Sequence, residues 1–193
     1  MGTNLDTQEN IRKAAKHLFA KKGYNATSTR EIVSEAGANI SAIAYHFGGK
    51  EGLFLSLFDD FLKLGNAAPA SFEDPISELK TLLSRIIGLR FEDPELVTIL
   101  QQEIVVQSTR TEAIKDRLVP IWHRIFFILD QGKERGKFQF LNSYNALNFV
   151  MSVAVFPRQN PFFGDVVDVN ESEDTVTEEM ISFIFKGLGW RDH

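Results

Sequence analysis

Residues 36–51 read AGANISAIAYHFGGKE, and this stretch decides how the first part of the chain folds. Gly37 interrupts a helical pattern, and Asn39 is a good N-cap for a new helix two residues later. Ile43 and Phe47 lie four residues apart, so a short helix buries both on one side. The two glycines that follow end this helix. The stretch therefore predicts a helix, a three-residue break and a second helix of about two turns.

The residues before this stretch predict two more helix boundaries. Apolar residues repeat at helical spacing over about 7–22, and Gly23 ends that helix. Ser28 and Glu31 form the sequence signature of a capping box at the start of the next one. The helix, break and short helix have the proportions of a helix-turn-helix motif over 28–47. The outward residues of its second helix are mostly small, which suits insertion into a DNA major groove.

The rest of the chain also reads as helix, with almost no alternation typical of strands. The segment over about 50–64 is apolar almost all round, and Asp-Pro pairs begin helices at residues 75 and 94. Further helices are expected over about 111–135, 143–156 and 175–186. The sequence predicts an all-α fold of about nine helices, with a helix-turn-helix head at 5–65 and a larger helical bundle at 66–193.

Composition excludes several classes of protein. The chain has 193 residues and no cysteine, so it has no disulfide framework and no thiolate metal site. Its polar start is unlike a signal peptide, and no apolar run approaches the roughly 20 residues of a membrane span. We therefore expect a cytoplasmic protein that does not enter membranes.

Charge is divided unevenly along the chain. Residues 1–50 hold seven Lys/Arg and four Asp/Glu, whereas residues 51–193 hold fourteen and twenty-two. A basic head on an acidic body favours an anionic polymer as the partner of the head. The alternative is an ordinary solvated surface.

No pattern in the sequence points to catalysis. The four histidines are scattered and have no metal-ligand spacing. FGGKEG lacks the other residues of a phosphate-binding loop, and no G-x-S-x-G turn is present. Asp59 and Asp60 are adjacent on a helix, so their carboxylates point apart. We expect no enzyme activity, no metal and no cofactor.

Read together, the first 55 residues resemble the DNA-binding region of the TetR/AcrR family of bacterial transcriptional regulators. The matching stretches are IRKAAKHLF, Gly23, Thr27, TREIVSEAGAN and IAYHFGGKEGL. The family usually places a tyrosine directly after the apolar residue that is Ile43 here. This chain instead has Ala44 at that position and Tyr45 next.

The resemblance implies which residues touch DNA. The expected contacts are Ser28, Thr29, Arg30, Asn39, Ile40, Ser41, Ala42, Tyr45, His46 and Lys50. Among them, Ile40 and Ala42 are able to touch a thymine methyl group, and Lys50 begins a helix whose amides favour a phosphate. For His46 the alternative is a hydrogen-bonded packing residue, and for Lys50 it is a solvated charge.

The resemblance also implies that residues 5–65 form the DNA-binding domain and residues 66–193 the ligand-binding and dimerisation domain. It further implies a homodimer, a palindromic operator and a small apolar or amphipathic ligand that releases a repressor from DNA. The expected pocket lining is Phe54, Phe58, Leu62, Trp122, His123 and Phe126; the expected dimer interface is Phe149, Val153, Phe156, Ile181, Phe185 and Leu188. The alternatives are that these aromatic residues are plain core and that both apolar faces of the last two helices pack within the chain. The competing function is an all-helical small-molecule carrier or interaction protein that does not bind DNA.

Overall fold

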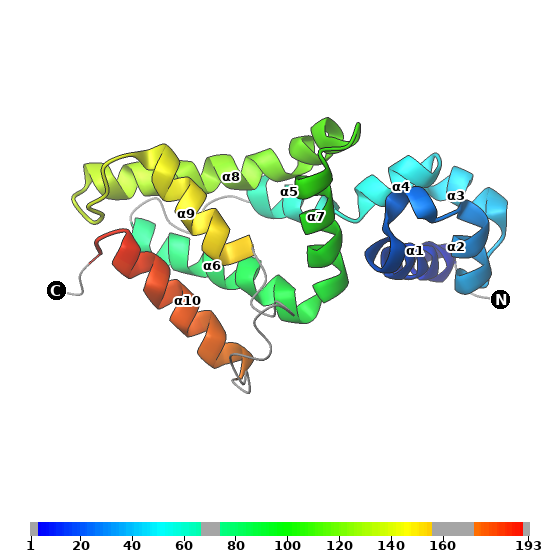
Figure 1. Cartoon of the computed structure of the whole chain (residues 1–193), viewed down its shortest axis with the longest axis horizontal. Coiled ribbons are helices and arrows are strands. Elements are labelled where there is room, and N and C mark those ends of the chain that lie inside the picture. Colours follow the sequence, from blue (N-terminus) through cyan, green and yellow to red (C-terminus); the bar gives the residue numbers. More distant parts are fainter. Residues whose placement is uncertain (1–3, 67–73, 156–171, 191–193) are drawn as a thin grey trace. The chain divides into compact units, whose positions relative to one another are not determined.

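The computed structural model describes residues 4–66, 74–155 and 172–190, and every regular element in these ranges is an α-helix (Figure 1). The all-α prediction is confirmed. The described ranges contain ten helices, one more than the sequence predicted. Their bounds are α1 Asn4–Ala26, α2 Thr29–Ala36, α3 Ile40–Phe47, α4 Lys50–Ser56, α5 Asp59–Asn66, α6 Pro75–Glu92, α7 Pro94–Val106, α8 Thr111–Glu134, α9 Ser143–Val155 and α10 Glu173–Gly187.

The additional helix comes from a break in the segment predicted as one helix over 50–64. α4 ends at Ser56 and α5 begins at Asp59. Between them, the amides of Leu57 and Phe58 bond to carbonyls three residues back, at 3.2 and 3.0 Å. Such bonds tighten the chain into a turn narrower than an α-helix. Large apolar residues on different sides of this segment are nevertheless buried. Two short helices with a turn between them therefore bury apolar side chains that one straight helix would leave partly exposed.

The described residues divide into two compact units. The first joins the residues up to Asn66 with Glu95–Pro120, and the second holds the described parts of Ala67–Pro94 and Ile121–His193. The first unit thus includes most of α7 and the start of α8, which the sequence had assigned to the bundle at 66–193. The helix α8 runs through the boundary at Pro120.

The core of the first unit forms where α1 packs against α2, α3 and α4. Ile11, Ala15 and Phe19 on α1 are completely buried, as the helical spacing predicted. The Phe19 ring meets Phe54 of α4 edge-on, with ring centroids 5.2 Å apart. This apolar packing fixes the helix-turn-helix on α1.

The second unit has a core built by α6, α9 and α10, which contact one another. Arg90 on α6 joins all three, because its Nη2 donates to the Val153 carbonyl at 2.8 Å and its Nη1 lies 3.4 Å from the Met180 sulfur. Burial lowers the pKa of Arg90 to about 10, which leaves the guanidinium charged at neutral pH. A partly buried ion pair between Glu78 and Arg124, at 3.1 Å, ties α6 to α8 within the same unit.

Candidate nucleic-acid interface

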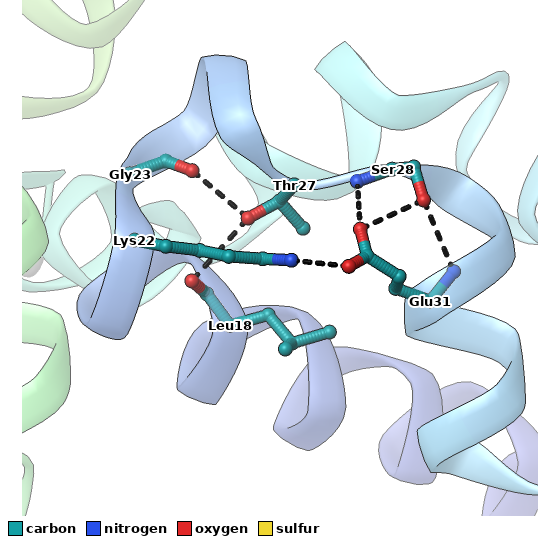
Figure 2. Close-up of polar contacts among 6 residues, drawn as sticks. All are labelled: Leu18, Lys22, Gly23, Thr27, Ser28 and Glu31. Carbon is teal, nitrogen blue, oxygen red and sulfur yellow. Dashed lines mark hydrogen bonds and ion pairs between the residues drawn. The ribbon is translucent and has the colours of Figure 1, made fainter.

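The start of α2 is fixed by a capping box, as the sequence predicted (Figure 2). The amide of Glu31 donates to Ser28 Oγ at 3.2 Å, and the amide of Ser28 donates to Glu31 Oε2 at 2.8 Å. The ammonium of Lys22 on α1 pairs with the other carboxylate oxygen of Glu31. Bonds from Lys22 and then from Ser28 lower the pKa of Glu31 to about 2. The carboxylate therefore stays ionised and ties α2 to the end of α1.

The buried side chain of Thr27 stabilises the connection between α1 and α2 (Figure 2). Its side chain is 1% exposed, and its hydroxyl lies 2.8 Å from the Gly23 carbonyl and 3.3 Å from the Leu18 carbonyl. Gly23 has φ 79° and ψ 164°, so the helical path of α1 kinks there. Glycine adopts this backbone conformation without the steric cost that a Cβ imposes. The kink and the buried hydroxyl together set where α2 begins.

The break between α2 and α3 has the predicted chemistry. Gly37 adopts a left-handed conformation with φ 62°, and the Ala38 amide donates to the Val33 carbonyl at 2.9 Å. The side chain of Asn39 then accepts a hydrogen bond from the Ser41 amide at 3.1 Å. The chain therefore turns at the glycine and starts a new helix at the asparagine, which confirms the helix-turn-helix.

The outer face of α3 carries two large exposed side chains among smaller ones. Ile40 is 50% exposed and Tyr45 77% exposed, while Ile43 is buried against the core. Among the other expected DNA contacts, Ser28, Arg30, Asn39 and Ser41 are exposed, and Thr29, Ala42, His46 and Lys50 are half-buried. Phe47 is half-buried rather than buried, so that part of the prediction was too strong. The roles of these residues toward DNA stay predictions.

Lys50 does not project freely from the first turn of α4. Its ammonium lies 4.1 Å from the centroid of the Tyr24 ring, and the guanidinium carbon of Arg110 lies 3.9 Å from the same centroid. Burial and, second, the charge of Arg110 lower the pKa of Lys50. Sequence reasoning missed Tyr24 and Arg110. Arg110 follows α7 far along the chain, and no local pattern connects it with the helix-turn-helix.

The expected pocket lining divides between the two units. In the first unit, Phe54 and Phe58 are completely buried and Leu62 is half-buried. Phe54 is enclosed by rings, because it meets Phe19, Tyr24 and Phe58 edge-on. In the second unit, Trp122 is half-buried and His123 and Phe126 are exposed. That these residues line a ligand pocket stays a prediction.

The expected dimer interface needs a correction on α10. Ile181, Phe185 and Leu188 are buried within the chain, whereas Phe183 is 68% exposed. Apolar residues circle α10, so spacing alone did not reveal which side packs on α6 and α9. On α9, Phe149 is 70% exposed and Val153 half-buried. Phe156 lies outside the described residues.

A groove of about 380 Å³ runs beside these exposed phenylalanines in the second unit. It is lined mainly by α9, α10 and the connection that precedes α9. Its lining includes Phe140, Leu141, Phe149, Val153, Phe183 and Leu188. An apolar groove flanked by exposed aromatic side chains is typical of a surface that another molecule covers.

Within the described ranges, no group of histidine, aspartate and glutamate side chains is arranged to hold a metal ion. None of the helices described is both long enough and apolar enough to span a membrane.

Comparison with known proteins places this geometry in a family. A family model described as bacterial regulatory proteins of the tetR family matches residues 11–57. The chain is 31% identical over 143 residues to the HTH-type transcriptional repressor NicS of Pseudomonas putida, covering 69% of this chain and 66% of NicS. It is 36% identical over 90 residues to the uncharacterized HTH-type transcriptional regulator YerO of Bacillus subtilis, covering 46% of this chain and 31% of YerO. The chain thus spans just under two thirds of NicS and about a third of YerO.

Solved structures resemble the chain over nearly its whole length. A linker-substituted form of HlyIIR has a TM-score of 0.75 at 30% identity, covering 91% of this chain and 97% of that one. HlyIIR itself, described as a hemolysin II transcriptional regulator, has a TM-score of 0.76 at 28% identity, covering 98% of this chain and 100% of that one. The similar proteins named above are described as transcriptional regulators, not as enzymes. The chain belongs to the tetR family of bacterial regulatory proteins and carries the DNA-binding domain of that family.

Proposed function

We propose that this protein is a cytoplasmic repressor that binds a palindromic operator as a homodimer and leaves it when a small apolar or amphipathic molecule binds. The open face of α3 carries the DNA-binding part of the proposal. That helix is capped by Asn39, anchored by buried Ile43, and exposes Ile40 and Tyr45. Two large apolar side chains held outward on a rigid helix favour contact with base edges and thymine methyl groups.

Charge supports the same role for the head. Residues 1–50 carry an excess of basic over acidic side chains, although the whole chain has a formal charge of −5. Arg30 is exposed on α2, and Lys50 begins α4 beyond the C-terminal end of α3. α4 has only seven residues, so the predicted phosphate contact rests on the Lys50 ammonium rather than on the amides of a long helix.

The homodimer is supported by the exposed aromatic surface of the second unit. Phe149 and Phe183 are largely exposed beside the groove between α9 and α10. Large apolar side chains that gather on one surface favour burial against a partner. A two-fold dimer also requires two equivalent half-sites in DNA, with centres about 34–36 Å or a multiple of that distance apart.

The DNA-binding part is tested by selecting fragments from random DNA with the purified protein and sequencing them. We expect an inverted repeat whose affinity falls steeply with salt, because basic side chains release counterions from DNA. Lys63→Ala is the control for the loss of one positive charge, since Lys63 is an exposed lysine on α5 outside the matched residues 11–57. We expect this variant to bind the selected DNA like wild type. Asymmetric sites, or binding that hardly depends on salt, would instead favour the carrier protein.

The ligand part is tested separately on the protein–operator complex. A thermal-shift screen of apolar and amphipathic compounds should find molecules that raise the melting temperature, because a ligand that binds only the folded state stabilises it. The same molecules should release the operator in a fluorescence anisotropy assay. Stabilising compounds that leave operator affinity unchanged would contradict ligand-controlled repression.

A further inference from the structure

One aromatic ring in the first unit is shared by two cations from distant parts of the sequence. Tyr24 follows the kink at Gly23, and its ring centroid lies 4.1 Å from the Lys50 ammonium and 3.9 Å from the Arg110 guanidinium carbon. Both distances are well within the roughly 6 Å over which a cation is attracted to a ring face. Lys50 belongs to the DNA-binding head, whereas Arg110 lies outside the matched residues 11–57.

The Tyr24 ring is held firmly by its apolar neighbours. It stacks on Phe19, with centroids 5.5 Å apart and an angle of 27° between the planes. It meets Phe54 edge-on at 5.0 Å. Both phenylalanines are completely buried, so the ring has little freedom to follow a movement of Lys50. The position of the ring therefore determines where the lysine ammonium rests.

Arg110 is held just as firmly on its other side. Its Nη2 donates to Glu103 Oε1 at 2.8 Å, and both side chains are 9% exposed. Ser108 completes this closed turn, because its hydroxyl donates to Glu103 Oε2 at 2.6 Å and accepts the Arg110 amide at 3.2 Å. A buried carboxylate and guanidinium depend on each other, since either one alone would be an uncompensated charge.

The turn that carries Arg110 connects α7 with α8. Gln107 in this turn has φ 48°, a left-handed conformation that side chains other than glycine rarely adopt. α8 starts at Thr111, directly after Arg110, and continues past Pro120 into the residues of the second unit. A shift of this turn would therefore change the platform on which Lys50 rests.

We propose that Glu103 and Arg110 act through the Tyr24 ring as positioning residues, which hold Lys50 where it meets a DNA phosphate. The proposal rests on the proposed function, because it requires that Lys50 contacts DNA. A lysine side chain has four rotatable bonds, and a ring that already orders them reduces the entropy lost on binding. The strength of the phosphate contact then depends on the turn between α7 and α8.

The proposal is tested with Tyr24→Leu, Tyr24→Phe and Arg110→Gln, each made in wild type and in Lys50→Ala. Tyr24→Leu should weaken operator binding by the dimer about 5- to 30-fold, the range for one lost Lys50–ring contact per subunit. Arg110→Gln should weaken it by a smaller factor, because the ring remains but loses the guanidinium that holds it in place. In the Lys50→Ala background the same substitutions should cost almost nothing. Tyr24→Phe keeps the ring and should bind like wild type.

The operator affinities separate failure of this proposal from failure of the proposed function. Losses that are equal with and without Lys50 would overturn the positioning role, because they would mean that the turn only supports the fold. If Lys50→Ala itself changes neither affinity nor salt dependence, the phosphate contact in the proposed function is wrong and the positioning role falls with it. Circular dichroism of each variant checks that the protein remains folded.

A measurement without DNA checks the geometry directly. In protein labelled with ¹³C at the lysine Cε, the Lys50 resonance is identified by its absence in Lys50→Ala. Protons above an aromatic ring are shielded, so we expect this resonance upfield of the other lysines. It should move to the ordinary lysine position in Tyr24→Leu and toward it in Arg110→Gln, and it should stay upfield in Tyr24→Phe. An unshifted wild-type resonance would overturn the proposal.

Discussion

Gly52 on α4 and the carbonyl of Phe47 at the end of α3 approach so closely that a Cβ on residue 52 would lie 1.9 Å from the carbonyl oxygen. No side chain fits at that distance. The two helices therefore meet backbone to backbone at this point. The contact fixes the direction of α4 relative to α3 and hence the position of Lys50, the first residue of α4.

We expect Gly52→Ala to destabilise the protein by about 1–3 kcal/mol, the usual cost of forcing extra atoms into a packed site. Gly88→Ala is the matched control, because its Cβ would only meet the end of the Glu92 side chain at 3.7 Å. That control should gain about 0.5–1 kcal/mol, since alanine favours a helix interior. Urea unfolding of both variants measures these changes. Equal effects of both substitutions would mean that α3 and α4 separate easily.

The capping box should make the stability of the first unit depend on acid. The pKa of Glu31 is about 2 in the folded protein, below its ordinary value of 4.5. The stability from its ionised form is therefore fully present above pH 4.5 and is lost as the pH falls toward 2. Glu31→Gln should be less stable than wild type at pH 7, and the difference should shrink between pH 4.5 and 2.

Two further variants check this assignment. Ser28→Ala should cost about 1 kcal/mol, because it removes the side chain that caps α2. Glu112→Gln disrupts an exposed pair with Lys115 and should have little effect at either pH. Thermal unfolding at pH 7 and pH 3 measures all three. A difference between wild type and Glu31→Gln that is as large at pH 3 as at pH 7 would contradict the role of the ionised carboxylate.

Replacing Arg30 and replacing Lys50 should change DNA binding in different ways. Ser41 is short and Ile40 and Ala42 are apolar, so a side chain that grips a base with two hydrogen bonds has to come from outside α3. Arg30 is the exposed arginine on α2, and Arg30→Ala should cost about 1–3 kcal/mol per half-site and relax the preference at one base pair. Binding to the operator and to its single-base variants measures this change.

Lys50→Ala should weaken binding to all sequences almost equally. It should also reduce the slope of log affinity against log salt by about one unit per subunit, because a phosphate contact carries no sequence information. A salt series with both variants separates the two roles. If Arg30→Ala loses affinity uniformly, Arg30 is another phosphate contact, and specificity rests on methyl contacts and DNA shape.

The exposed phenylalanine on α9 should control assembly. Phe149→Glu places a charge on the surface that we propose is covered in the dimer, and it should convert the protein to monomer and abolish specific DNA binding. Helicity should not change, because the side chain is 70% exposed in the single chain. Val105→Glu alters an equally exposed residue of α7 and should leave the dimer intact. Equilibrium sedimentation measures the oligomeric state of wild type and of both variants. A monomeric wild type at micromolar concentration would contradict the dimer.

The parts of the fold set by neighbouring residues could be predicted from the sequence. Ser28 caps α2 through Glu31, and Asn39 caps α3 through the amide of Ser41; each interaction spans two or three residues. The predicted boundaries of the helix-turn-helix, 28–47, therefore lie within one residue of the observed ones. The position of Thr27 was also marked, although only by resemblance to the family and not by its own chemistry.

Other features depend on contacts between distant residues and left no local signal. α10 carries apolar residues on all sides, so spacing could not reveal that Phe185 packs inward and Phe183 outward. No glycine or proline marks the break after Ser56, whose carbonyl accepts a hydrogen bond from Arg12 of α1 at 3.1 Å. The contact of Arg110 with Tyr24 joins residues that lie far apart in the sequence, so it forms only in the folded chain.

The division into two units has a consequence for spectroscopy. The chain contains two tryptophans, Trp122 and Trp190, and both belong to the second unit. Trp190 packs edge-on against Phe185 with ring centroids 5.3 Å apart, so its emission should change when that packing is lost. Tryptophan fluorescence therefore reports unfolding of the second unit and does not directly detect the DNA-binding head. Circular dichroism at 222 nm detects helices in both, and two curves that fail to coincide would reveal units that unfold separately.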